Sequence, residues 1–117
     1  MKVSLPWPSP ALSPNARTHW RRKAEAVRRY RAACGWAARA AGLGPVGADA
    51  LAVTLTFHGP DARRRDTDNM LASIKGGLDG LADVLGVDDS RWSLTLRRGE
   101  PVKGGAIIAE IETGEAG

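Results

Sequence analysis

Several residue types that define common protein classes are scarce in this sequence. Cys34 is the one cysteine among 117 residues, so no intramolecular disulfide can form and the cysteine clusters that hold structural zinc are excluded. Prolines at positions 6, 8 and 10 interrupt the N-terminal segment, where a secretion signal needs an unbroken apolar stretch. No apolar run approaches the ~18 residues that cross a membrane. We therefore expect a cytoplasmic protein without a membrane segment.

The positive charge is gathered in the first half of the chain. Residues 1–65 contain twelve basic and three acidic residues, whereas residues 66–117 contain five basic and ten acidic ones. Such a basic half favours a polyanionic partner, because lysine and arginine neutralise phosphates. Thirteen of the seventeen basic residues are arginine, which suits bidentate phosphate contacts, although a GC-rich coding sequence would give the same enrichment. The densest run supplies three candidate phosphate contacts: Arg63, Arg64 and Arg65.

Apolar periodicity predicts six elements in the order strand, helix, strand, helix, strand, strand. The last two strands are close in sequence and are joined by RGEPVKGG, a hairpin-type loop. The prediction is one compact α+β domain over residues 1–112, in which helices pack on a mixed or mostly antiparallel sheet, followed by a disordered tail, 113–117. The expected ranges of the elements are 2–5, 20–41, 50–58, 68–85, 92–98 and 106–112.

The first predicted helix has one apolar stripe and several arginines on its other faces. Arg21 and Arg22 lie near its start and are candidate contacts for a polyanion, with an ordinary solvated face as the alternative. Apolar residues spaced by threes and fours are expected to be buried together. They are Ala26, Val27, Tyr30, Ala33, Cys34, Ala37 and Ala41.

The second predicted helix presents polar residues along a line separate from its leucine-rich stripe. Asp68, Lys75 and Asp79 are separated by seven and four residues, which places them within roughly 20° of one line in a continuous helix. Lys75 would then project its ammonium toward Asp68. The alternative is an ion pair between Lys75 and Asp79.

Two acidic pairs flank this helix. Asp66 and Asp68 open it, where aspartates commonly cap a helix and complement its dipole, while Asp88 and Asp89 follow it in GVDDS, where an Asx-type turn is the structural alternative. If the chain turns back beside the sheet, three carboxylates converge, and such a cluster needs a hard cation such as Mg²⁺. Magnesium held in this way supports phosphodiester hydrolysis.

Two stretches of this sequence resemble one known family. RRRDTDNMLASIKGGLDGLADVLGVDDSRW has an arginine-led DxDN opening a helix, a lysine further along and a DD pair after a GV turn, and LPWPSPALSPNARTHWRRK has a strand ending in LPWP before an Asn and an Arg. Together they resemble the RusA family of Holliday-junction resolvases. In the best-known members the lysine follows the second aspartate by four residues, where this chain has Ala72, whereas here it follows by seven.

The resemblance implies a homodimeric, Mg²⁺-dependent endonuclease of DNA recombination and repair that nicks paired strands at four-way junctions. It implies metal ligation by Asp66, Asp68 and Asp89, with Asp88 as the adjacent alternative. Lys75 would stabilise charge that develops on the phosphate. Asn15 and Arg17 would contact DNA.

Two other functions are compatible with the same residues. One is a nuclease that acts on other branched DNA, such as flaps or forks, and the other is a catalytically idle DNA-binding protein whose aspartates only cap a helix. His19 and His58 have no partner at a metal-ligand spacing. For His19 and Trp20 we expect packing, with DNA contact as the alternative.

Overall fold

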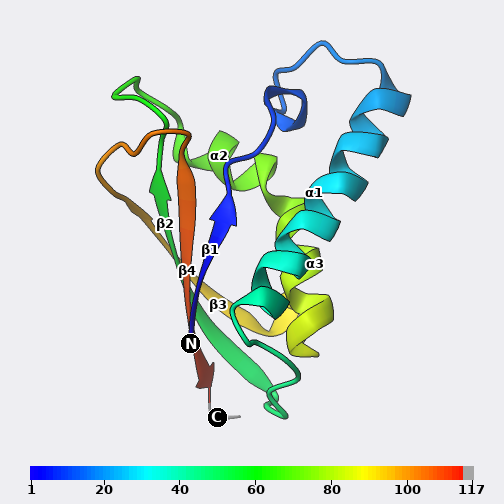
Figure 1. Cartoon of the computed structure of the whole chain (residues 1–117), viewed down its shortest axis with the longest axis vertical. Coiled ribbons are helices and arrows are strands. Elements are labelled where there is room, and N and C mark those ends of the chain that lie inside the picture. Colours follow the sequence, from blue (N-terminus) through cyan, green and yellow to red (C-terminus); the bar gives the residue numbers. More distant parts are fainter. Residues whose placement is uncertain (115–117) are drawn as a thin grey trace.

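The computed structural model describes residues 1–114 and consists of one four-stranded sheet with helices on one of its faces (Figure 1). This confirms the predicted α+β class. The elements in chain order are β1 (Lys2–Pro6), the 3₁₀ turn η1 (Pro10–Leu12), α1 (Trp20–Ala40), β2 (Ala50–His58), α2 (Thr67–Ser73), α3 (Lys75–Leu85), the 3₁₀ turn η2 (Asp89–Arg91), β3 (Trp92–Arg98) and β4 (Ala106–Gly114).

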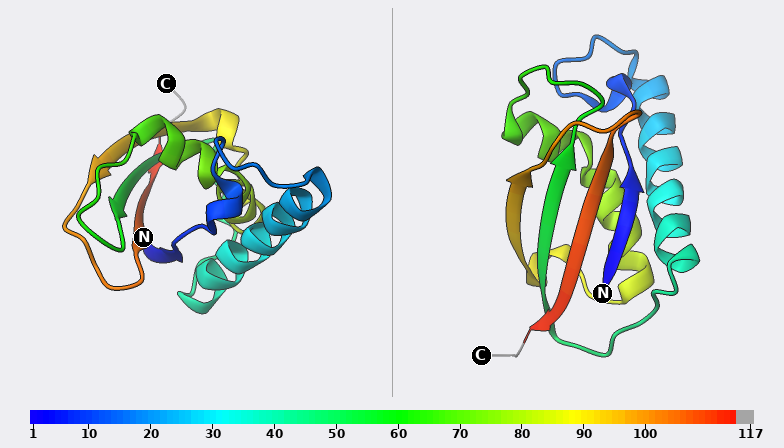
Figure 2. Two further views of the ribbon diagram at one scale, coloured as in Figure 1. Left: turned by 90° about the horizontal axis from the view of Figure 1, so that it is seen from above. Right: turned by 60° about the vertical axis from the view of Figure 1, so that its left-hand side comes forward.

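The sheet is mixed, as predicted, with the strand order β1-β4-β2-β3. β4 pairs antiparallel with both β1 and β2, and β2 pairs parallel with β3. In β2 the alternate residues Leu51, Val53, Leu55 and Phe57 are buried, because they face the helices that Figure 2 shows on that side of the sheet. Every second residue of a strand points to the same face, so the predicted alternation is confirmed.

The predicted hairpin between the last two strands is wrong. β2 lies between β3 and β4, so these strands do not pair. Two parallel strands need a long crossover, and α2 with α3 forms that crossover from β2 to β3. The loop over residues 99–105 passes the end of β2 instead, where the Gly99 N–H donates to the carbonyl of Phe57 and the Val102 N–H donates to that of Gly59.

The single helix predicted over 68–85 is broken at Ile74. This residue has φ −104° and ψ 5°, and its N–H is shared between the carbonyls of Leu71 and Ala72, as in a tightened final turn. Glycines 76 and 77 follow immediately, and glycine favours a helix less than any residue except proline. Asp68 and Lys75 therefore belong to different helices, and the angular line predicted for them does not exist.

The apolar stripe predicted for α1 is largely confirmed, because Ala26, Val27 and Ala37 are partly buried against the core that contains Tyr30 and Cys34. Tyr30, Cys34 and Ala38 are buried together with Gly35, whereas Ala33 and Ala41 are exposed. The two helices α1 and α3 pack closely, since a Cβ atom on Gly80 would lie 2.2 Å from the Arg31 carbonyl oxygen. Small residues on both helices allow this approach.

The last strand is longer than predicted. β4 extends to Gly114, where Thr113 still pairs with Leu51, so the first two residues of the expected tail belong to a strand. The rest of that tail, residues 115–117, lies outside the described residues. None of the described helices combines the length and apolar character that a membrane crossing requires.

Candidate functional site

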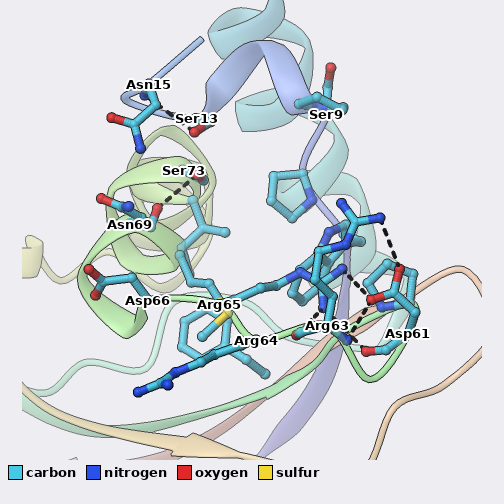
Figure 3. A pocket seen from close by; sticks show the side chains of 17 residues that line it. Ser9, Ser13, Asn15, Asp61, Arg63, Arg64, Arg65, Asp66, Asn69 and Ser73 are labelled. Carbon is cyan, nitrogen blue, oxygen red and sulfur yellow. Dashed lines mark hydrogen bonds and ion pairs between the residues drawn. The ribbon is translucent and has the colours of Figure 1, made fainter.

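A cleft of about 700 Å³ lies where β1 and β2 end. Its walls come from the proline-rich segment after β1, the arginine-rich loop after β2, and α2 (Figure 3). Asn15 of the first segment and Arg63, Arg64, Arg65 and Asp66 of the second thus line one cavity. Both stretches that carry the family resemblance meet here, although they are far apart in the sequence.

Asp61 organises the arginine-rich loop. Its Oδ1 accepts hydrogen bonds from the Arg63 N–H and from Nη2 of Arg65, each at 2.9 Å. These bonds lower the pKa of the Asp61 carboxyl, with the Arg63 N–H as the largest cause. Nη1 of Arg65 also donates to the backbone carbonyls of Asp61 and Arg63, and its guanidinium lies 5.5 Å from the ring centroid of Trp7. Arg65 is therefore committed to holding the loop.

Arg64 has a different environment from its neighbours. Its side chain is exposed, and no hydrogen bond or ion pair joins it to another residue in the part of the chain that the structure describes. In Figure 3 it extends away from Asp61 toward the side of the cleft where Asp66 lies, while Arg63 and Arg65 turn toward Asp61. Of the three arginines, Arg64 has no ion pair among the described residues, Arg63 is 79% exposed and reaches Asp61 only at 3.9 Å, and Arg65 is the one held by the loop.

Asp66 caps α2. Its Oδ1 accepts a hydrogen bond of 3.0 Å from the Asp68 N–H, which confirms the capping role that the sequence indicated. Asp68 lies in the first turn, and both carboxylates are exposed. Because a cap uses one oxygen of Asp66, the other oxygen and both oxygens of Asp68 stay open to solvent or to a ligand.

Arg98 is a residue of this region that the sequence did not single out. From the end of β3 its Nε and Nη2 donate to Oγ1 of Thr67 at 3.1 and 2.8 Å. Thr67 separates the two aspartates, so Arg98 brings a positive charge to the start of α2. No sequence signal could have found this contact, because it depends on β3 lying beside β2.

The second acidic pair divides into two roles. Asp88 caps η2 and accepts a hydrogen bond of 3.1 Å from the Ser90 N–H. Hydrogen bonds from Ser90, first from its side chain and then from its backbone, lower the pKa of the Asp88 carboxyl. Asp89 is half-buried and its Oδ2 lies 3.7 Å from Nζ of Lys75. Lys75 therefore meets Asp89, and within the described residues it forms no ion pair with Asp79, the alternative that the spacing suggested.

The described residues contain no group of three or more His, Cys, Asp or Glu side chains that could hold a metal ion. The convergence of three carboxylates thus stays a prediction. The donor chemistry of Asp66 and Asp68 still suits magnesium, which proteins bind through one or two carboxylates together with waters and substrate phosphates. Asp89 would join them only by exchanging its contact with Lys75.

The remaining candidate DNA contacts lie outside the cleft. Arg17, Arg21 and Arg22 are exposed, and none of them lines the cavity. Arg22 borders a separate hollow beside Glu25. The structure therefore brings Asn15 to the arginine-rich loop but leaves these three arginines on the neighbouring surface.

Comparison with known proteins names no activity for this chain. No protein-family model matches it. It is 43% identical, over 93 residues, to an uncharacterized protein of Xylella fastidiosa (strain Temecula1 / ATCC 700964), and the matched part covers 77% of this chain and 61% of that protein. The chain thus spans about three fifths of the length of this relative.

Proposed function

We propose that this protein is a Mg²⁺-dependent, structure-specific DNA endonuclease that acts as a homodimer on four-way junctions, as its resemblance to the RusA family implies. The observation that carries the proposal is the cleft. Two motif segments separated by residues 24–62, one with Asn15 and one with Arg64 and Asp66, line the same cavity. A shared cavity suits a nuclease in which one segment holds the DNA backbone and the other holds the metal; Asp66 lines this cavity, whereas Asp68 lies in the same helical turn but is not among the lining residues.

In this proposal the residues divide the work by charge. Arg64 binds a phosphate beside the site, since its guanidinium has no partner among the described residues, and Asn15 contacts the same strand from the opposite wall. Asp66 and Asp68 would hold Mg²⁺, which when bound activates water and stabilises the leaving oxygen. Lys75 would stabilise charge that develops on the phosphate, and Asp89 would join the metal ligands when it exchanges its 3.7 Å ion pair with Lys75.

A second candidate function is a DNA-binding protein that does not cut. It is favoured by the capping bonds of Asp66 and Asp88, which give both acidic pairs a structural role without any metal. In that case the cleft and its arginines would bind DNA, but adding Mg²⁺ would not lead to cleavage.

The variant Asp68→Asn separates these functions. It removes one carboxylate charge and keeps the size of the side chain, so we expect junction cleavage in Mg²⁺ to be abolished while junction binding is largely retained. The measurements are cleavage of a labelled four-way junction, with flaps and forks as parallel substrates, and calorimetric titration of Mg²⁺. Asp49→Asn is the matched control, because Asp49 is exposed and precedes the start of β2, at the opposite end of that strand from the cleft.

Three outcomes are informative. Full cleavage by Asp68→Asn would refute the nuclease site proposed for this protein. Cleavage of flaps or forks but not of junctions would change the substrate and keep the chemistry. If the wild-type protein binds DNA but neither binds Mg²⁺ nor cuts any of these substrates, the second candidate is the correct one.

A further inference from the structure

Trp20 is a large aromatic residue that the fold leaves in solvent. Its side chain is 68% exposed at the first position of α1, which overturns the expectation that it packs. Burying an indole ordinarily makes one of the larger apolar contributions to folding stability. This chain has few aromatic residues, so an unburied one is notable. Exposure alone does not single Trp20 out, because Trp36 is equally exposed; its surroundings do.

Two neighbours hold the indole in place. The His19 ring stacks on it, with centroids 5.7 Å apart and an interplanar angle of 28°, and the Arg21 guanidinium lies 5.2 Å from its ring centroid. His19 is itself fixed as the helix cap, because its Nδ1 accepts a hydrogen bond from the Arg21 N–H. The indole is therefore supported on its own helix while most of its surface stays open.

The surroundings of Trp20 are basic and lie at the same end of the molecule as the cleft. The segment after Asn15 leads from the cleft wall directly into α1, and Figures 1 and 2 show the first turn of α1 at the end where the arginine-rich loop lies. The first turn of α1 contains no acidic residue. Glu25, one turn further on, is paired with Arg29 at 2.7 Å. A polyanion that leaves the cleft in this direction meets Arg17, Arg21 and Trp20 in turn.

We propose that Trp20 is a stacking platform for a nucleobase whose face is open at a branch point or in a single strand, an inference that rests on the proposed function. Within a duplex, neighbouring base pairs cover both faces of each base, so an indole has nothing to stack on. In a single strand, or at a junction whose arms are not stacked on one another, one face is open, and every base offers such a face. Arg17 and Arg21 bind the flanking phosphates, and Trp20 distinguishes branched from linear DNA.

Trp36 provides the matched comparison on the same helix. It is also 68% exposed, but it lies sixteen positions further along α1, away from the cleft, on a surface where Arg31 is paired with Asp83. The two tryptophans therefore have equal exposure, and Arg28 and Arg39 also lie near Trp36, but only Trp20 is at the end of α1 that the proline-rich segment joins to the cleft. A general effect of removing a surface tryptophan would be the same for both.

The experiment compares Trp20→Ala, Trp20→Phe and Trp36→Ala in equilibrium binding to a four-way junction, a single strand and a linear duplex at one salt concentration. Loss of base stacking should weaken binding of Trp20→Ala to the junction and the single strand by about tenfold. Binding to the duplex should not change, and the salt dependence should keep its slope because no phosphate contact is removed. Trp20→Phe should restore most of the affinity, and Trp36→Ala should match the wild type.

The inference is overturned if Trp20→Ala binds all three DNAs as the wild type does, or if it loses equal affinity for the duplex. Thermal unfolding of each variant tests whether the fold is intact. We expect unchanged midpoints, because both tryptophan side chains are exposed. This result can be told apart from failure of the nuclease proposal, because the role of Trp20 can be measured by binding even if the protein does not cut junctions. A wild-type protein that binds none of these DNAs would overturn both.

Discussion

Replacing Gly80 with alanine tests the close packing of α1 on α3, the contact that fixes where both helices lie. A Cβ atom at position 80 would lie 2.2 Å from the Arg31 carbonyl oxygen, whereas ordinary contacts begin near 3.4 Å. The obstacle is backbone on a helix, so the two helices must separate by roughly an ångström. Overpacking of this kind costs ~1–3 kcal/mol, and a rigid backbone places it at the upper end.

The same substitution improves helix propensity by ~1 kcal/mol, so we expect a net loss of ~2 kcal/mol in the free energy of unfolding. For a domain of this size that corresponds to a fall of about 6–10 °C in the thermal midpoint. Urea unfolding followed by far-UV circular dichroism gives the free energy, and a thermal scan gives the midpoint.

Gly35→Ala is the matched control, because Gly35 lies on α1 in the same interface. Its Cβ atom would be 3.6 Å from the Gly80 carbonyl oxygen, an ordinary contact. Without a clash only the propensity gain remains, so this variant should be more stable than the wild type by up to ~1 kcal/mol. If Gly80→Ala is as stable as Gly35→Ala, the reasoning about this interface is refuted.

Two further predictions concern the arginine-rich loop and the buried thiol. Arg64→Ala should lower the slope of log K against log salt for DNA binding by about 1 and leave the thermal midpoint unchanged. Arg65→Ala should lower the thermal midpoint, because Arg65 is bonded to Asp61 and lies over the Trp7 ring. Equal midpoints for the two variants would contradict this difference in roles. Burial raises the pKa of the Cys34 thiol to about 11, so the unfolded chain releases this proton at lower pH than the native protein. The stabilising contribution of the neutral thiol is complete below the ordinary thiol pKa and declines as the pH rises toward 11. Between pH 8 and pH 10.5 the free energy of unfolding of the wild type should therefore fall by up to ~2 kcal/mol more than that of Cys34→Ala. Equal declines of the two proteins in urea unfolding would contradict this prediction.

The elements of this fold follow from local sequence patterns. Strand alternation in β2 and apolar spacing in α1 act within a few residues, so their positions could be predicted closely. The break at Ile74 was missed, because it combines poor glycine propensity with a packing demand from α1 that no local pattern contains. The pairing of β2 with β3 was missed for a similar reason, since proximity along the chain favours a hairpin and only the assembled sheet shows which edge is occupied.

The candidate site divides in the same way. The sequence alone marked Asp66 as a cap and as a possible ligand, and it placed Arg63, Arg64 and Arg65 in one run of equivalent charges. Only the tertiary structure distinguished them, because Asp61 and Trp7 engage Arg65 and leave Arg64 free among the described residues.

What the sequence determined by itself is the class of fold, the uneven charge and the two acidic pairs, since each depends on residue type and short-range spacing. The structure decided which of these residues meet. It brought the proline-rich segment to the arginine-rich loop, joined Lys75 to Asp89 and left Trp20 in solvent. The physical reason is that contacts between distant segments depend on how helices and strands pack, and packing is a property of the whole chain.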